Sequence, residues 1–181
     1  MNTLAGNGSA ITLSLLIFMG LPANVANATN RIGAMVQTFA AVISLRKTPR
    51  TKFMFKESKW FFIPSLIGAT LGAFLAVDIN PDVLRFIIGL IMLFLLITLL
   101  NKPKKWLKAT NVSERSRSKL NWFLIFLIGF YGGFIQMGIG IMILSVLVLL
   151  MDYSLKDANI IKLLLAMVFL IPAFFVFLWS G

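Results

Sequence analysis

Long apolar stretches, separated by short polar ones, follow one another along almost the whole chain. The stretch 60–77 (WFFIPSLIGATLGAFLAV) carries no charged residue, and neither do 86–100, 120–151 and 163–181. Roughly 18 to 20 apolar residues, each adding about 1.5 Å of helix, span a hydrocarbon layer about 30 Å thick. The pattern therefore predicts an all-α polytopic membrane protein with about seven hydrophobic helical segments.

Glycine interrupts the apolar pattern at two places. The segment 129–140 (GFYGGFIQMGIG) holds five glycines in twelve residues, and 5–8 (AGNG) holds two. Because Gly costs about 1 kcal/mol against Ala in a helix, and unpaired backbone in lipid costs several kcal/mol, we expect broken helices that face protein or water. The expected helix-break positions are Gly6, Gly8, Gly138 and Gly140. Close helix packing through small residues is the alternative for 129–140, and it is what the G-x-x-x-G spacing of 68–72 predicts.

The chain also matches itself at an offset of 132 residues. Residues 6–41 fall on 138–173 without a gap, and 11 of these 36 positions are identical. The identical pairs are Gly6/Gly138, Gly8/Gly140, Ile11/Ile143, Leu15/Leu147, Met19/Met151, Ala26/Ala158, Asn27/Asn159, Ala34/Ala166, Met35/Met167, Val36/Val168 and Ala41/Ala173. Apolar composition alone would not be expected to align a G-x-G pair and an Ala-Asn pair together, so we predict an internal duplication.

The duplication divides the chain into three parts. These are 1–45, the core of repeat 1; 46–119, a two-helix segment flanked by basic loops; and 120–181, the core of repeat 2. A counterpart of 121–137 would begin before residue 1, and nothing after Gly181 matches 60–101. We therefore expect repeat 1 to be incomplete at its N-terminus and repeat 2 to be incomplete at its C-terminus.

Basic residues orient the chain. The net charge is +11, from 17 Lys and Arg against six Asp and Glu, and 13 of the 17 lie in 46–59 and 102–119. The positive-inside rule makes both loops cytoplasmic, so the acidic turn 78–82 between them is external. If 120–151 forms either two short tilted helices or a re-entrant hairpin, the last helix, about 157–179, ends outside. The two repeats are then inverted, as in many secondary transporters whose sites lie near the bilayer midplane.

Composition argues against catalysis. Hydrophobic residues make up 59% of the chain, and it has no His and no Cys. Four of the six carboxylates fall in expected loops, so the sequence offers no metal cluster, no nucleophile with a base and no paired acids. We expect no enzyme, no cofactor and no metal site. Asp152 and Asp157 are interpreted as helix-end caps at the inner surface, with a role as proton carriers as the alternative.

Polar and charged residues nevertheless occur where hydrocarbon is expected. The stretch 20–33 (GLPANVANATNRIG) includes Arg31, and Lys162 falls at the repeat position of Asn30. A charge near the bilayer centre costs roughly 3 kcal/mol or more, so it normally faces a cavity or a partner. The expected substrate-binding residues are Asn27, Thr29, Asn30, Arg31, Gln136, Asn159 and Lys162. The alternatives are that Arg31 and Lys162 snorkel to the membrane surface and that Gln136 only caps a helix.

The combined motifs resemble the TauE/SafE family of sulfite exporters. The resemblance rests on a Gly-rich element, an apolar helix ending in a Pro or short turn, and the segment 26–30 (ANATN), with the arrangement duplicated and separated by basic loops. Gly6, Gly8, Asn27, Thr29 and Asn30 match the first element; Gly138, Gly140 and Asn159 match the second. The chain departs from the family's usual glycine-rich run at Asn7, Ser9, Ile139 and Ile141.

The resemblance implies a function. It indicates a secondary transporter that exports small sulfur-containing anions, of the sulfite or sulfonate class, by alternating access in a bacterial inner membrane. The partners are then the small sulfur anion and the lipid bilayer, without nucleic acid, and a homodimer is left open. An accessory or assembly subunit of a membrane complex and an anion channel are the alternatives.

Overall fold

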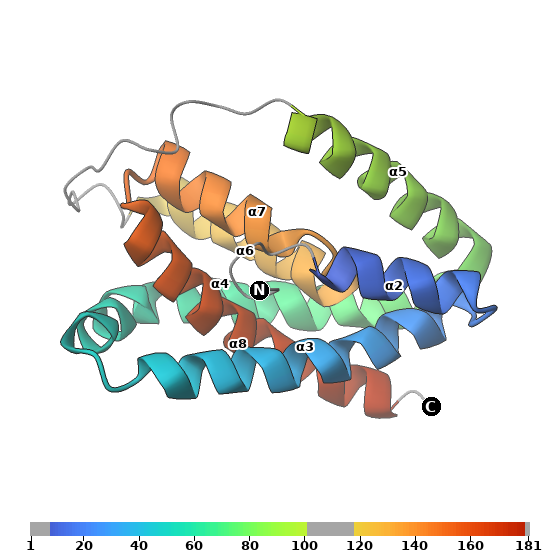
Figure 1. Cartoon of the computed structure of the whole chain (residues 1–181), viewed down its shortest axis with the longest axis horizontal. Helices are drawn as coiled ribbons and strands as arrows, with labels where there is room; N and C mark the ends of the chain where they lie inside the picture. Colours follow the sequence, from blue (N-terminus) through green and yellow to red (C-terminus); the bar gives the residue numbers. More distant parts are fainter. Residues whose placement is uncertain (1–7, 101–117, 180–181) are drawn as a thin grey trace.

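A computed structural model describes residues 8–100 and 118–179, which form a bundle of helices (Figure 1). In chain order the helices are α2 (Gly8–Phe18), α3 (Ala23–Leu45), α4 (Pro49–Asp78), α5 (Pro81–Leu100), α6 (Lys119–Phe134), α7 (Ile139–Ser145), a π-helical turn (Val146–Leu150) and α8 (Leu155–Trp179). The described residues contain no strand, and the all-α prediction is confirmed. Gly6 and most of the loop 102–119 lie outside the described residues.

The surface of the bundle is apolar and its interior holds polar side chains. Phe18, Phe175 and Leu178 are among the large apolar side chains that are exposed, whereas Arg31 and Lys162 are buried. Of the helices in the described ranges, α4 and α8 are long and apolar enough to cross a membrane. Lipid, not water, is the solvent that suits this distribution, because apolar side chains then face hydrocarbon and polar groups find partners inside.

Helix α4 begins eleven residues earlier than the sequence pattern indicated. The prediction of a loop over 46–59 is wrong, because only its first three residues precede the helix. The side-chain oxygen of Thr48 accepts a hydrogen bond from the Thr51 N–H at 3.3 Å, and Pro49 occupies the first helical position. Both features are typical helix starts. Four of the six basic residues of this region, those from Arg50 to Lys59, therefore lie on the first three turns of a helix about 45 Å long.

Helices α4 and α6 pack backbone against backbone. Each carries two glycines four residues apart, Gly68 and Gly72 in α4 and Gly129 and Gly133 in α6. A Cβ on Gly68 would collide with the backbone of Phe126, and a Cβ on Gly133 would collide with that of Ala69. The predicted role of 68–72 in close helix packing is confirmed, and α6 contributes a matching pair.

The region 120–151 forms a helical hairpin. Helix α6 ends at Phe134, the chain turns over 135–138, and α7 leads back beside α6 (Figure 1). The turn is buried throughout, which fits the requirement that non-helical backbone inside a membrane be surrounded by protein or water. Close packing and a helix break were alternatives for 129–140, and the segment contains both. Its first part, at Gly129 and Gly133, packs closely against α4, and the helix then breaks over 135–138.

The order of a short helix, a turn and a long helix occurs twice. At the offset of 132, α2 corresponds to 140–150 and α3 to 155–177, and the structure has helix over 139–150, including the π-helical turn, and over Leu155–Trp179. Helices α3 and α8 run in opposite directions (Figure 1). In agreement, the ring of Phe177, near the end of α8, lies 4.5 Å from the guanidinium carbon of Arg31, near the start of α3.

Candidate functional site

A cavity of about 150 Å³ lies among α2, α3, α7 and α8, beside the α6–α7 turn. The polar residues that line it are Ser9 and Thr12 of α2, Asn30, Gln37 and Thr38 of α3, Gln136 of the turn and Lys162 of α8. Apolar side chains, among them Ile143 and Phe169, form the remaining wall. One water needs only about 10–15 Å³ of such space, so the cavity has room for a small anion.

Residues from both matching segments, 6–41 and 138–173, line this cavity. At the offset of 132, Asn30 corresponds to Lys162, Ala34 to Ala166, and Gln37 to Phe169, and all six line the cavity. The cavity therefore lies where the two matching segments meet. The segments differ in chemistry, since 6–41 contributes two amides at the positions where 138–173 contributes an ammonium group and a ring.

The charge and hydrogen-bonding groups of the cavity suit an anion. Lys162 is 4% exposed, and the lining residues include this one cation and no carboxylate. Asn30 Nδ2 and Gln136 Oε1 are buried and have no hydrogen-bond partner among the described residues. Buried polar groups normally find a partner, because leaving one unpaired costs about 1–3 kcal/mol. A bound polar molecule would satisfy both groups.

The α6–α7 turn brings Gln136 to the cavity. Gln136 and Gly138 both have positive φ, 66° and 69°, a conformation that glycine adopts readily and glutamine seldom does. The hydroxyl of Tyr131 donates a hydrogen bond to the main-chain carbonyl of Met137. A hydrogen bond within the hairpin thus holds the turn, and Gln136, with its strained backbone, lines the cavity.

Arg31 and Asn27 contact the carbonyl end of α6 and do not line the cavity. Both side chains are completely buried. The guanidinium of Arg31 donates to the carbonyls of Gly132 at 3.1 Å, Phe134 at 3.2 Å, and Gly133. Asn27 Nδ2 donates to the carbonyl of Phe134 at 2.8 Å.

The structure brings together only some of the residues expected to form the site. Asn30, Gln136, Gly140 and Lys162 line one cavity. Thr29 is exposed, Asn159 is half-buried outside the cavity lining, Gly8 is the first residue of α2, and Gly138 lies in the turn. The roles of these four residues stay predictions.

Sequence reasoning missed two polar residues of α3 in the cavity wall. Gln37 follows Asn30 by seven residues, which is two helical turns, and Thr38 follows it by eight. Residues at this spacing share one face of a helix. The signal was therefore present in the sequence as a polar stripe extending from the segment 26–30.

An ion pair links the starts of α4 and α8. The guanidinium of Arg50 donates to both carboxylate oxygens of Asp157, at 2.7 and 2.6 Å. The main-chain N–H of Asp157 donates to Ser154 Oγ at 3.2 Å, so Asp157 lies in the capped first turn of α8. Arg50 is 107 residues away from Asp157 in sequence, so the spacing of residues within one helix could not predict this pair.

Comparison with known proteins identifies a family and two relatives. The family model described as sulfite exporter TauE/SafE matches residues 1–181. A probable membrane transporter protein, ORF9, of a Sinorhizobium species is 28% identical over 183 residues, which cover 99% of this chain and 68% of the relative. A probable membrane transporter protein of Haemophilus influenzae is 27% identical over 164 residues, which cover 87% of this chain and 60% of the relative. No solved structure matches significantly.

Proposed function

The chain belongs to the sulfite exporter TauE/SafE family of membrane transporters, and we propose that it is a secondary transporter that exports small sulfur-containing anions of the sulfite or sulfonate class. The observation that carries this proposal is the cavity with the buried side chain of Lys162 in its wall. The chain spans about two thirds of the length of the relatives it matches. The proposed location is the bacterial inner membrane.

The chemistry of the cavity supports an oxyanion as substrate. The ammonium group of Lys162 supplies positive charge and N–H donors, and Asn30 Nδ2 supplies a buried donor that lacks a partner among the described residues. Sulfite and sulfonate oxygens accept such hydrogen bonds, which are stronger when one partner is charged. Gln136 Oε1 would accept from a water or from a protonated oxygen of the anion.

The placement of the cavity supports alternating access. Transporters built from inverted repeats bind their substrate between the repeats, at broken helices, and rock one repeat against the other. Here the cavity lies between two copies of the same helix order, beside a broken helix, and the long helices α3 and α8 run in opposite directions. We propose that the two repeats are inverted and exchange access to this cavity.

Flux measurements on the chain in proteoliposomes test the proposal. The panel contains sulfite, a short alkanesulfonate, sulfate and chloride, each offered with and without the same anion on the opposite side. We expect saturable flux of sulfite or the sulfonate, stimulated by anion on the other side, and at least a tenfold loss in Lys162→Gln. Lys156→Gln is the matched control, because Lys156 lies on the same helix but is exposed.

Each alternative gives a different result. An anion channel passes chloride and shows no stimulation by anion on the other side. An accessory subunit gives no flux of any anion, whether or not Lys162 is present. Equal flux in Lys162→Gln and Lys156→Gln would remove Lys162 from the proposed site.

A further inference from the structure

The carbonyl end of α6 lies inside the bundle, where water does not reach it. The last four carbonyls of an α-helix have no partner within the helix, and together they carry the negative end of the helix dipole. In α6 three of them, those of Gly132, Gly133 and Phe134, accept hydrogen bonds from the guanidinium of Arg31. A positive charge thus faces the negative end of a helix, which explains how this arginine is buried with no aspartate or glutamate of the described residues paired to it.

We infer that Arg31 and Asn27 are positioning residues that clamp the end of α6 to α3 and so hold Gln136 in the cavity. In this role neither side chain binds the anion directly, in contrast to the expectation from sequence. The effect on transport rests on the proposed function. The clamp itself does not rest on the proposed function, because it consists of hydrogen bonds from α3 to the end of α6.

The terminal nitrogens of Arg31 are already engaged, whereas its buried Nε has no hydrogen-bond partner among the described residues. Both terminal nitrogens donate to α6 carbonyls, and the ring of Phe177 lies 4.5 Å from the guanidinium carbon. The side chain is 0% exposed and is absent from the cavity wall. An anion would have to displace the carbonyls to obtain the bidentate contact that makes arginine a strong oxyanion ligand.

Asn27 completes the clamp from the same face of α3. It precedes Arg31 by four residues, so the two side chains lie one above the other, and its Nδ2 donates to the carbonyl of Phe134. Phe134 therefore receives hydrogen bonds from both residues. Gln136 follows only two residues later, with a strained backbone, so its position depends on where the end of α6 is held.

Thiol labelling tests the clamp without any anion. The natural chain has no cysteine, so Met137→Cys, buried in the turn, gives a single reporter for the position of the hairpin tip. We expect Arg31→Gln to raise the rate of labelling by a water-soluble maleimide at least tenfold, and Arg31→Lys and Asn27→Ala to raise it less. Arg85→Gln is the matched control, because it removes an exposed arginine. An unchanged rate in Arg31→Gln would overturn the clamp.

Flux measurements then separate positioning from binding. If Arg31 acts through Gln136, the losses caused by Arg31→Gln and Gln136→Ala are less than multiplicative when the two changes are combined. Multiplicative losses, together with unchanged labelling, would instead make Arg31 an independent anion ligand. If Arg31→Gln fails to fold, Asn27→Ala is carried through both measurements in its place. Absence of flux in the unsubstituted chain would contradict the proposed function alone, since the labelling result does not depend on it.

Discussion

The two cations buried in the bundle, Arg31 and Lys162, have different surroundings. Arg31 faces three helix carbonyls and an aromatic ring, whereas Lys162 reaches the wall of a cavity. A guanidinium spreads its charge over a planar fork, which suits several acceptors at once, and an ammonium is a compact charge. This difference supports the proposals that Arg31 positions the end of α6 and that Lys162 contacts the substrate.

Sequence alone predicted that these residues lie inside, but not what each one contacts. Asn27, Asn30 and Arg31 were all expected to bind substrate, yet Asn30 lines the cavity while the other two contact α6. Asn30 and Arg31 are consecutive, so their side chains lie about 100° apart around the helix axis and meet different neighbours. The end of α6, which Arg31 and Asn27 contact, is about 100 residues away in sequence. The sequence pattern around α3 therefore could not identify it as their partner.

A negative charge at Gln136 should abolish anion binding in the cavity. We expect Gln136→Glu to lower flux at least tenfold, because a carboxylate in the cavity wall repels an anionic substrate and competes with it for the positive charge of Lys162. Gln136→Ala should lower flux less, since it only removes the amide. Initial rates in proteoliposomes check this, with Asn80→Asp at the exposed α4–α5 turn as control. Equal losses of flux in Gln136→Glu and Gln136→Ala would argue against an anion-binding site in this cavity.

At the scale of elements, glycine spacing makes α4 and α6 one unit. Their four glycines allow backbone contact along two helical turns, and packing of this kind is a main source of stability between helices in lipid. The sequence showed the glycines of α4 as a packing motif. It did not show that the partner helix would be α6, because a small-residue motif specifies a close approach and not the identity of its partner.

A methyl group at this contact should weaken the protein. We expect Gly133→Ala to lower the melting temperature in detergent, because its Cβ would overlap the backbone of Ala69 and overpacking costs about 1–3 kcal/mol. Gly89→Ala is the control, since a Cβ at Gly89 meets nothing within 4 Å; removing a helical glycine there should be neutral or stabilise by up to about 1 kcal/mol. A melting temperature that does not change in Gly133→Ala would mean that α4 and α6 separate easily.

The start of α4 shows why element boundaries were harder to predict than elements. The basic composition of 46–59 indicated a loop, and charge does orient such segments at a membrane. Thr48 followed by Pro49 is nevertheless a helix-start signal, and the structure follows that signal. Charge and helix formation are independent here, because a helix can extend beyond the hydrocarbon layer and expose basic side chains to water.

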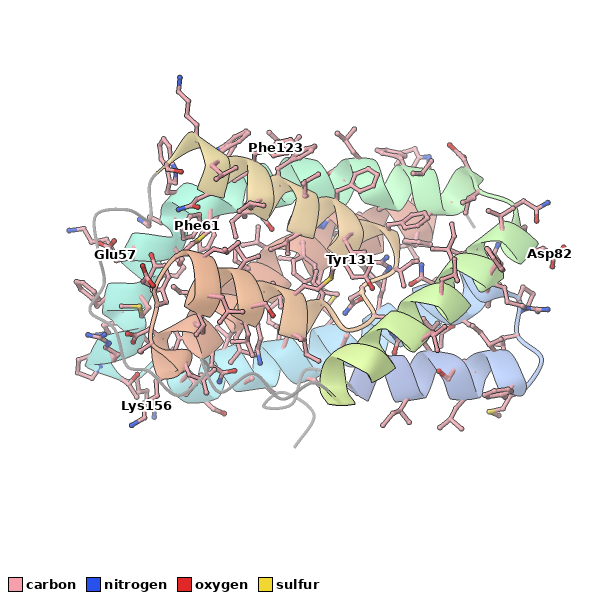
Figure 2. All side chains as sticks on the ribbon, turned by 90° about the horizontal axis from the view of Figure 1, so that it is seen from above. Glu57, Phe61, Asp82, Phe123, Tyr131 and Lys156 are labelled. Atoms are coloured by element: carbon pink, nitrogen blue, oxygen red, sulfur yellow. The ribbon has the colours of Figure 1, made fainter. Side chains whose placement is uncertain are left out.

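At the scale of the whole molecule, charge and fold indicate the same orientation. Glu57 and Lys156, on the first turns of α4 and α8, lie near one end of the bundle, and Asp82 lies at the opposite end (Figure 2). The basic end is the one that the positive-inside rule makes cytoplasmic. The ion pair between Arg50 and Asp157 fixes the starts of the two helices together at that end.

Single cysteines test this orientation in whole cells. We expect Lys47→Cys to be labelled by a membrane-impermeant maleimide only after the cells are opened, and Asn80→Cys to be labelled in intact cells, because both positions are exposed and lie at opposite ends of α4. Arg46→Cys, next to Lys47, should behave as Lys47→Cys does. Labelling of Lys47→Cys and Asn80→Cys from the same side would contradict a membrane-spanning α4.

The unequal chemistry of the two repeats has a consequence for the transport cycle. When two inverted repeats exchange conformations, a cavity with identical walls would present the same site to both sides of the membrane. Here an amide at Asn30 corresponds to an ammonium group at Lys162, so the two end states of the proposed cycle would not be related by twofold symmetry. Anion binding and release would then have different rate constants on the two sides of the membrane. Equal and opposite gradients would drive unequal currents, so the flux would rectify. The equilibrium distribution of the anion would still be fixed by its gradient and the membrane potential.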